Sequence, residues 1–252
     1  MPMLETRGLT KRYPGVTALD SLDLSLEPGI IGLVGANGAG KSTLIKILLG
    51  LLEPTEGTGT LLGFDIAAQG PEVRQYVGYM PEHDCLPPDM SATDFVGHMA
   101  RISGLPRTAA RERTAETLRH VGLFEERYRE IRGYSTGMKQ RVKLAQALVH
   151  DPDVIFLDEP LTGTDPIARR DLIDIIQRLA SDGKSVLVSS HVLHEVESLT
   201  QNIILLNHGR LVAEGYVRQI RDLIDKHPHN IMLVCDEYRQ LATRLVSWGD
   251  VE

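Results

Sequence analysis

The chain has 252 residues, of which 42% are hydrophobic and 24% are charged, and its formal net charge is -7. This length suffices for one large domain, or for one domain with a short appendage. The ordinary composition does not favour disorder. The negative charge argues against a chain whose whole surface binds DNA irrespective of sequence, although a local basic patch is compatible with it.

Neither a disulfide framework nor a membrane-spanning segment is expected. Cys85 and Cys235 are the only cysteines, they lie far apart, and they suit a reducing cytosol. The N-terminal residues lack the apolar stretch of a signal peptide. The most apolar run, residues 44–52, is interrupted by Lys46 and is far shorter than the roughly 20 residues that span a bilayer. We therefore expect a cytoplasmic chain, so a role in transport would require a separate membrane subunit.

The N-terminal part predicts two kinds of strand. The first thirty residues alternate apolar and polar side chains, as half-buried antiparallel strands do. Residues 30–34 are nearly all apolar, which is typical of a parallel strand covered on both faces. After a glycine-rich turn, a helix is expected from about Lys41 to Leu52, ended by Pro54 and Gly57.

The turn itself has the pattern of a phosphate-binding loop. Gly35-Ala36-Asn37-Gly38-Ala39-Gly40-Lys41-Ser42 fits G-x-x-x-x-G-K-[ST], between a buried-type strand and a helix. Glycines let successive N–H groups point at phosphate oxygens, and the following helix adds its positive dipole end. Lys41 is expected to bridge the β and γ phosphates, and the Ser42 hydroxyl to bind Mg²⁺. The sequence thus predicts a nucleotide site rather than a chance glycine-rich turn.

The middle of the chain is predicted to be strand, then helix. Strand-like pieces occur at 58–62 and 77–80. Residues from about 90 to 132 are mostly helical in pattern and polar, so their charges are interpreted as a solvated face. These charges are Arg111, Glu112, Arg113, Glu116 and Arg119.

The segment Tyr134-Ser135-Thr136-Gly137-Met138-Lys139-Gln140-Arg141 predicts the start of another helix. Ser135 is the expected N-cap, and Asp151-Pro152 ends the helix. A capped, exposed helix N-terminus is an anion site. Because Lys41 already serves the phosphate loop, the simplest use of this second site is to reach a nucleotide held by another subunit.

Two acids end the apolar strand expected at 154–157. Asp158 is placed to complete the Mg²⁺ shell through water, and Glu159 to polarise the attacking water. The alternative is that the two acids only cap the strand before Pro160. The presence of a phosphate loop in the same chain disfavours this alternative.

His191 follows the next expected strand, 186–190, so its imidazole should emerge near the same sheet edge and could donate to the γ-phosphate. The spacing of His191 and His194 also suggests zinc. That alternative lacks a third ligand, and Glu195 does not fit the usual helical metalloprotease order.

Strands at 203–206 and 211–213, joined by a hairpin turn at 207–210, complete the pattern. The alternation of strands and helices predicts an α/β fold with a mainly parallel sheet and helices on both faces.

These motifs together resemble an ATP-binding cassette (ABC) ATPase over about residues 3–220. The resemblance implies a P-loop NTPase of the ABC type, in which an antiparallel β subdomain and a helical subdomain at about 85–150 accompany the core sheet. Residues 1–220 would form the nucleotide-binding domain, and 221–252 a β/α appendage of unknown role. ATP and Mg²⁺ are the implied cofactors.

The resemblance also implies a role for each motif residue. Tyr13 corresponds to the aromatic that stacks on adenine, and residues Gly35 to Thr43 to the phosphate loop. Ser135 and Gly137 correspond to the signature loop, Asp165 to the dimer-contact aspartate, and His191 to the switch histidine. Asp158 and Glu159 would be the magnesium aspartate and the catalytic glutamate.

Two departures from the family pattern stand out. The signature loop, usually Leu-Ser-Gly-Gly-Gln, is Tyr134 to Met138 here, but it keeps Ser135 and Gly137. The usual glutamine after Tyr79-Met80-Pro81 is Glu82, which could still reach Mg²⁺ through water while adding negative charge beside the phosphates. Both variants resemble bacterial exporter ATPases that serve drug, lipid or polysaccharide efflux.

The expected assembly is a head-to-tail homodimer that sandwiches two ATP molecules and powers an integral membrane permease from the cytoplasmic face of the cell membrane. Residues 84–95 would receive the permease, and no nucleic acid is expected. A non-transport ABC ATPase acting on ribosomes or DNA is the alternative. It is disfavoured because no second cassette, long coiled coil or zinc module is present.

Overall fold

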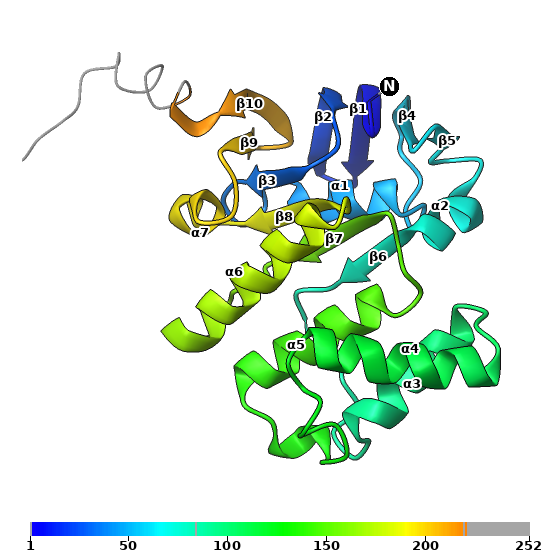
Figure 1. Ribbon diagram of the computed structural model, residues 1–252. Helices are drawn as coiled ribbons and strands as arrows, with labels where there is room; N and C mark the ends of the chain where they lie inside the picture. The colour runs from blue at the N-terminus through cyan, green and yellow to red at the C-terminus, as the bar shows by residue number, and fades with distance from the viewer. Residues whose placement is uncertain (1, 84, 219, 221–252) are drawn as a thin grey trace, which may run out of the picture.

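The computed structural model describes residues 2–83, 85–218 and 220. In this part of the chain a six-stranded sheet stands at the centre, a four-stranded antiparallel sheet lies on one side, and a group of helices extends from the other (Figure 1). None of the described helices is both long enough and apolar enough to cross a bilayer. The appendage expected at 221–252 lies outside the described residues.

The antiparallel sheet has the strand order β2-β1-β4-β5. Its strands are β1 (Leu4–Tyr13), β2 (Val16–Leu26), β4 (Glu56–Leu61) and β5 (Phe64–Asp65). The predicted alternation is confirmed, because the leucines of β1 and β2 are buried. The strand expected at 58–62 is β4, which begins and ends earlier.

The central sheet has the order β10-β9-β3-β8-β7-β6. Its strands are β3 (Ile30–Val34), β6 (Val77–Met80), β7 (Val154–Asp158), β8 (Ser185–Ser190), β9 (Asn202–Asn207) and β10 (Arg210–Tyr216). Five of them pair in parallel, and β10 runs antiparallel to β9. The predicted mainly parallel sheet and its terminal hairpin are confirmed.

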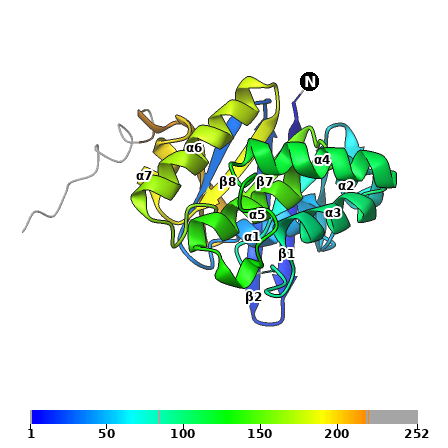
Figure 2. The same cartoon turned by 60° about the horizontal axis from the view of Figure 1, so that its bottom comes forward.

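Helices cover both faces of the central sheet, as predicted. The elements are α1 (Lys41–Leu48), α2 (Gly70–Tyr76), α3 (Ala92–Ile102), α4 (Arg107–His120), the 3₁₀ turn η1 (Ile131–Gly133), α5 (Thr136–Leu148), α6 (Pro166–Ser181) and α7 (Leu193–Glu197). Figure 2 shows α3, α4 and α5 as one group beside α6. On the opposite face, α1 packs between the central sheet and the antiparallel sheet.

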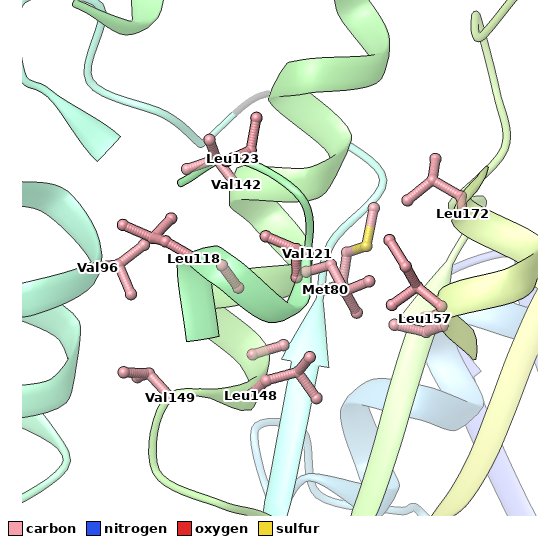
Figure 3. Close-up of a cluster of buried hydrophobic side chains, with 14 of the residues drawn as sticks. Met80, Val96, Leu118, Val121, Leu123, Val142, Leu148, Val149, Leu157 and Leu172 are labelled. Atoms are coloured by element: carbon pink, nitrogen blue, oxygen red, sulfur yellow. The ribbon is translucent and has the colours of Figure 1, made fainter. Parts of the chain in front are cut away.

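Strand β7 shows how the sheet divides the apolar core. Val154 and Phe156 join one cluster, which they share with α1 and the antiparallel sheet. Ile155 and Leu157 join the other, which extends under α3, α4, α5 and α6 (Figure 3). This is the result of side chains alternating across a strand that is covered on both faces.

The expected extent of the first helix was wrong. Helix α1 ends at Leu48 rather than near Leu52, because Gly50 adopts φ +62° just beyond it. The Gly50 N–H bonds the Ile47 carbonyl and the Leu51 N–H bonds the Lys46 carbonyl, the pair of bonds that ends a helix at a left-handed glycine. Pro54 and Gly57 lie too far along the chain to set this boundary.

Candidate functional site

The loop between β3 and α1 needs its glycines for packing and for conformation. A Cβ on Gly35 would lie 2.5 Å from the Leu206 carbonyl oxygen, and one on Gly40 would lie 2.5 Å from the Ala18 carbonyl oxygen. Gly38 and Gly40 also adopt φ of +82° and +105°, which L side chains rarely adopt. These glycines therefore allow the loop to curl tightly enough for its backbone amides to point at an anion. Larger residues at the same positions would prevent this conformation.

The loop forms the floor of a cleft of about 560 Å³. Its walls come from β1, β2, the segment after β6 and the end of β7. The lining residues are Tyr13, Val16, Ala18, Asn37, Gly38, Ala39, Gly40, Lys41, Ser42, Thr43, Glu82, Asp158 and Glu159. Most residues that the sequence assigned to nucleotide and metal binding thus meet in one place.

Lys41 is buried at the base of this cleft. Its Nζ donates to the carbonyl oxygen of Gly35 at 2.7 Å and approaches that of Ala36 at 3.4 Å. It also lies 3.8 Å from Oε1 of Glu159. The ammonium is therefore aimed at the inside of the loop, where phosphate oxygens would compete for it.

Glu159 is held in an unusual conformation by the neighbouring strand. Its φ is +51°, in the left-handed region that costs free energy for a residue with a side chain. Its N–H bonds the carbonyl and the hydroxyl of Ser189, at 3.2 Å each. This kink directs the carboxylate back over the phosphate loop rather than along the strand.

The carboxylate of Glu159 has three further partners. His191 Nδ1 lies 3.0 Å from both of its oxygens. The hydroxyls of Thr162 and Ser190 lie 3.3 Å and 3.4 Å from Oε2. The structure therefore brings His191 to Glu159, as its position at the end of β8 predicts. Neither hydroxyl could be assigned a role from the sequence, since Ser190 at the end of β8 and Thr162 in the loop after β7 belong to no motif.

A second buried acid, Asp158, points into the same region. It is 2% exposed and accepts a hydrogen bond from the Ser189 hydroxyl. Burial raises the pKa of Tyr79 to about 12, and the negative charges of Asp158 and Glu82 add to that rise. Asp158, Glu159 and Glu82 also line the cleft together with the phosphate loop, so carboxylates gather where a cation would be favoured.

The oxygen donors of the cleft suit a magnesium ion. Ser42, Asp158 and Glu82 supply hydroxyl and carboxylate oxygens, the ligands that Mg²⁺ prefers together with phosphate and water. In the described residues no group of three or more His, Cys, Asp or Glu side chains is arranged to hold a metal by itself. A cation here would thus share its shell with nucleotide and water.

Ser135 and Gly137, two predicted site residues at the start of α5, do not line the cleft. The Ser135 hydroxyl accepts a hydrogen bond from the Met138 N–H at 3.3 Å, so Ser135 is the predicted N-cap. A Cβ on Gly137 would lie 2.5 Å from the Cβ of Ala168 in α6. Both residues therefore have a structural role in this chain, besides any contact with a second subunit.

Asp165 lies outside the cleft as well and caps α6. Its Oδ1 accepts hydrogen bonds from the N–H groups of Ala168 and Ile167, at 3.0 Å each. The bond from Ala168 is the main reason that the pKa of Asp165 is lowered. The loop that carries Asp165 thus stays charged and fixed at the N-terminus of α6, with Ile167 exposed beside it.

Tyr13 and His194 complete the predicted set. Tyr13 lies at the end of β1, is 43% exposed and lines the cleft, so its ring is accessible for stacking. His194 Nδ1 lies 3.8 Å from Glu197, and the other histidine of the zinc alternative, His191, faces Glu159.

Comparison with known sequences gives consistent matches. Residues 19–162 match the family model described as ABC transporter. The chain is 36% identical to the daunorubicin/doxorubicin resistance ATP-binding protein of Streptomyces peucetius over 245 residues, which cover 97% of this chain and 74% of that protein. It is 37% identical to Nod factor export ATP-binding protein I of Cupriavidus metallidurans over 221 residues, covering 87% and 73%.

Solved structures with the same fold include ATP-binding cassettes. A dimeric, post-hydrolysis cassette bound to ADP and phosphate is 25% identical, with a TM-score of 0.77, and the match covers 86% of this chain and 99% of that one. The ATP-binding subunit of an ABC transporter is 28% identical, with the same TM-score of 0.77 and coverage of 97% and 99%.

Proposed function

Given that this chain belongs to the ABC transporter family of ATP-hydrolysing subunits, we propose that it powers an exporter whose membrane-spanning permease is a separate chain. The observation that carries the proposal is the meeting of Lys41, Ser42, Asp158 and Glu159 in one cleft. The names of its drug-resistance and Nod factor export relatives support export rather than import.

The role that we propose for each cleft residue is supported by its position in the cleft. Lys41 and the loop amides bind the β and γ phosphates, and the Tyr13 ring stacks on the base. Ser42, Asp158 and Glu82 would hold Mg²⁺, and the ion would supply neutralisation of the charge that develops on the phosphates. Glu159 accepts the proton of the attacking water, and His191 orients the Glu159 carboxylate.

The proposed assembly is a homodimer. Ser135 and Gly137 of one copy would face the γ-phosphate held by the other, with Asp165 in the contact between copies. Loss of the γ-phosphate on hydrolysis would remove the group that both copies hold, so the dimer would open. The permease would bind at residues 84–95, of which 85–95 are among the described residues, with the ATPase on the cytoplasmic face of the membrane.

Purification from detergent-solubilised membranes of the source cells tests this proposal. The expected result is an integral membrane chain that copurifies with the ATPase and stimulates ATP turnover. Recovery with ribosomal particles, or stimulation of turnover by DNA instead, would contradict it in favour of a non-transport ABC ATPase.

A further inference from the structure

Three polar side chains, Gln140, Lys143 and Gln146, form a row along one side of α5. Their spacing of three residues keeps them within about a third of the helix circumference. Each donates a hydrogen bond to a main-chain carbonyl outside the helix. Apolar residues of the same helix, including Val142 and Leu148, enter the core cluster (Figure 3). Helix α5 is therefore held to neighbouring segments by hydrogen bonds as well as by apolar packing.

The two outer bonds attach α5 to strand β6 and to the loop after β7. Gln146 Nε2 donates to the Tyr79 carbonyl in β6 at 2.6 Å. Gln140 Nε2 donates to the Thr162 carbonyl at 3.2 Å, three residues beyond Glu159. Helix α5 is thereby connected, on both sides of the middle bond, to the two segments that carry Glu82 and Glu159.

Lys143 makes the middle bond and is only 3% exposed. Its Nζ donates to the carbonyl oxygen of Glu82 at 2.8 Å. An ammonium is costly to bury unless its hydrogen bonds and its charge are well matched. Glu82, whose carbonyl accepts this bond, also lines the cleft with its carboxylate. The buried Lys143 ammonium therefore lies behind the main-chain segment that brings the negative charge of Glu82 toward the phosphates.

We propose that Lys143 is a positioning residue for Glu82. By fixing the Glu82 carbonyl to α5, the ammonium keeps the main chain of that segment against the cleft, so that the exposed Glu82 side chain remains within reach of the bound cation. The positive charge also offsets part of the repulsion between the Glu82 carboxylate and the phosphates. This inference rests on the proposed role of Glu82 in binding Mg²⁺.

The test compares Lys143→Met, which keeps the apolar stem, with Lys143→Arg, which keeps a charged donor. The magnesium concentration at half-maximal effect is measured in two ways, by ATP hydrolysis and by the increase in Tm that Mg²⁺ produces in the presence of the non-hydrolysable analogue AMP-PNP. Lys143→Met is expected to raise this concentration about tenfold, the change expected when one charge-assisted hydrogen bond is lost. Lys143→Arg is expected to restore most of the wild-type value.

Gln146→Leu is the matched control. It removes a bond from the same row, but to Tyr79 rather than to Glu82. It is expected to lower Tm while leaving the magnesium requirement unchanged. If Gln146→Leu and Lys143→Met raise the requirement equally, the row is only structural and the inference is wrong.

Glu82→Ala separates the inference from the proposed function. It should raise the magnesium requirement by itself, and Lys143→Met should add less than about twofold in that background, because both changes act through one carboxylate. A fully additive effect, or an unchanged requirement in Lys143→Met alone, overturns the inference. An unchanged requirement in Glu82→Ala overturns the metal role of Glu82 itself.

Discussion

Lys41 and Glu159 form a buried ion pair, with Nζ 3.8 Å from Oε1 and side chains only 7% and 5% exposed. They come from the start of α1 and the end of β7, and they are the residues proposed to bind the γ-phosphate and to accept the proton of water. Each has other partners in place: Gly35 for the ammonium, and His191 for the carboxylate. Nucleotide binding would therefore exchange one set of contacts for another rather than engage groups without partners.

Glu159→Gln tests the proton acceptor. The amide keeps the size and the hydrogen-bonding oxygen of the carboxylate but cannot take up the proton, so we expect hydrolysis to fall by about 10²–10⁴-fold. ATP binding should persist and trap the dimer in its closed form. Phosphate release and size-exclusion chromatography with ATP measure the two effects, and turnover at the wild-type rate would remove Glu159 from the role of base.

Lys41→Met tests the ion pair. Loss of the ammonium should abolish ATP binding, and it should also lower the free energy of unfolding by about 1–3 kcal/mol, because the buried Glu159 carboxylate loses a compensating charge. Nucleotide titration and urea unfolding measure these effects. The matched double variant, Lys41→Met with Glu159→Gln, should regain stability without regaining binding. If the double variant is no more stable than Lys41→Met alone, the proposed energetic link between Lys41 and Glu159 is wrong.

Gly137→Ala tests the packing of α5 against α6. Because the added methyl would meet the Ala168 Cβ at 2.5 Å, we expect the free energy of unfolding to fall by about 1–3 kcal/mol. Adding Ala168→Gly opens the space and should recover stability. If ATP hydrolysis stays low in the stabilised double variant, the loss reflects the proposed contact with the partner's nucleotide. Full recovery of hydrolysis would instead assign Gly137 to packing alone.

Much of this site follows from local sequence patterns. The phosphate loop, Asp158, Glu159 and His191 each lie at the end of a strand whose apolar pattern is unambiguous, so the parallel sheet brings them to one edge. Thr162 and Ser190 could not be assigned in the same way. Their contacts depend on the left-handed φ of Glu159, whose N–H is bonded to Ser189 in the distant strand β8.

Burial of His150 predicts a dependence of stability on pH. Removal from water lowers the pKa of His150 below its ordinary value of 6.5, an effect larger than the opposing hydrogen bond to the Val77 carbonyl and the nearby charge of Asp151. The folded protein therefore binds this proton less readily than the unfolded chain does. Stability from this group is complete well above pH 6.5 and falls as the pH drops below that value.

His150→Gln removes this titration. Thermal unfolding between pH 8 and pH 5 should show that the wild type loses more Tm on acidification than the variant does. His194→Gln makes the same substitution at a histidine side chain that is 92% exposed and serves as the matched control. A parallel decline in wild type and His150→Gln would contradict the assignment.

The helix boundaries show where local patterns were insufficient. Pro54 and Gly57 are helix breakers and predict a boundary near Leu52, but α1 ends before Gly50, where a Cβ would lie 2.7 Å from the Cα of Gly70. The close approach of Gly50 to Gly70, twenty residues further along the chain, cannot be predicted from the periodicity of apolar residues. The row on α5 could not be predicted for the same reason, because the carbonyl partners of Gln140, Lys143 and Gln146 come from distant parts of the chain.

The alternation of β7 between two apolar clusters couples the two layers that pack on this strand. Ile155 and Leu157 pack with the helices that would carry partner contacts, whereas Val154 and Phe156 pack with the elements that support the phosphate loop. Both sets of side chains project from the same five-residue strand, which ends at Asp158. A displacement of the helices on one face would therefore be transmitted directly to the acidic residues beside the phosphate loop.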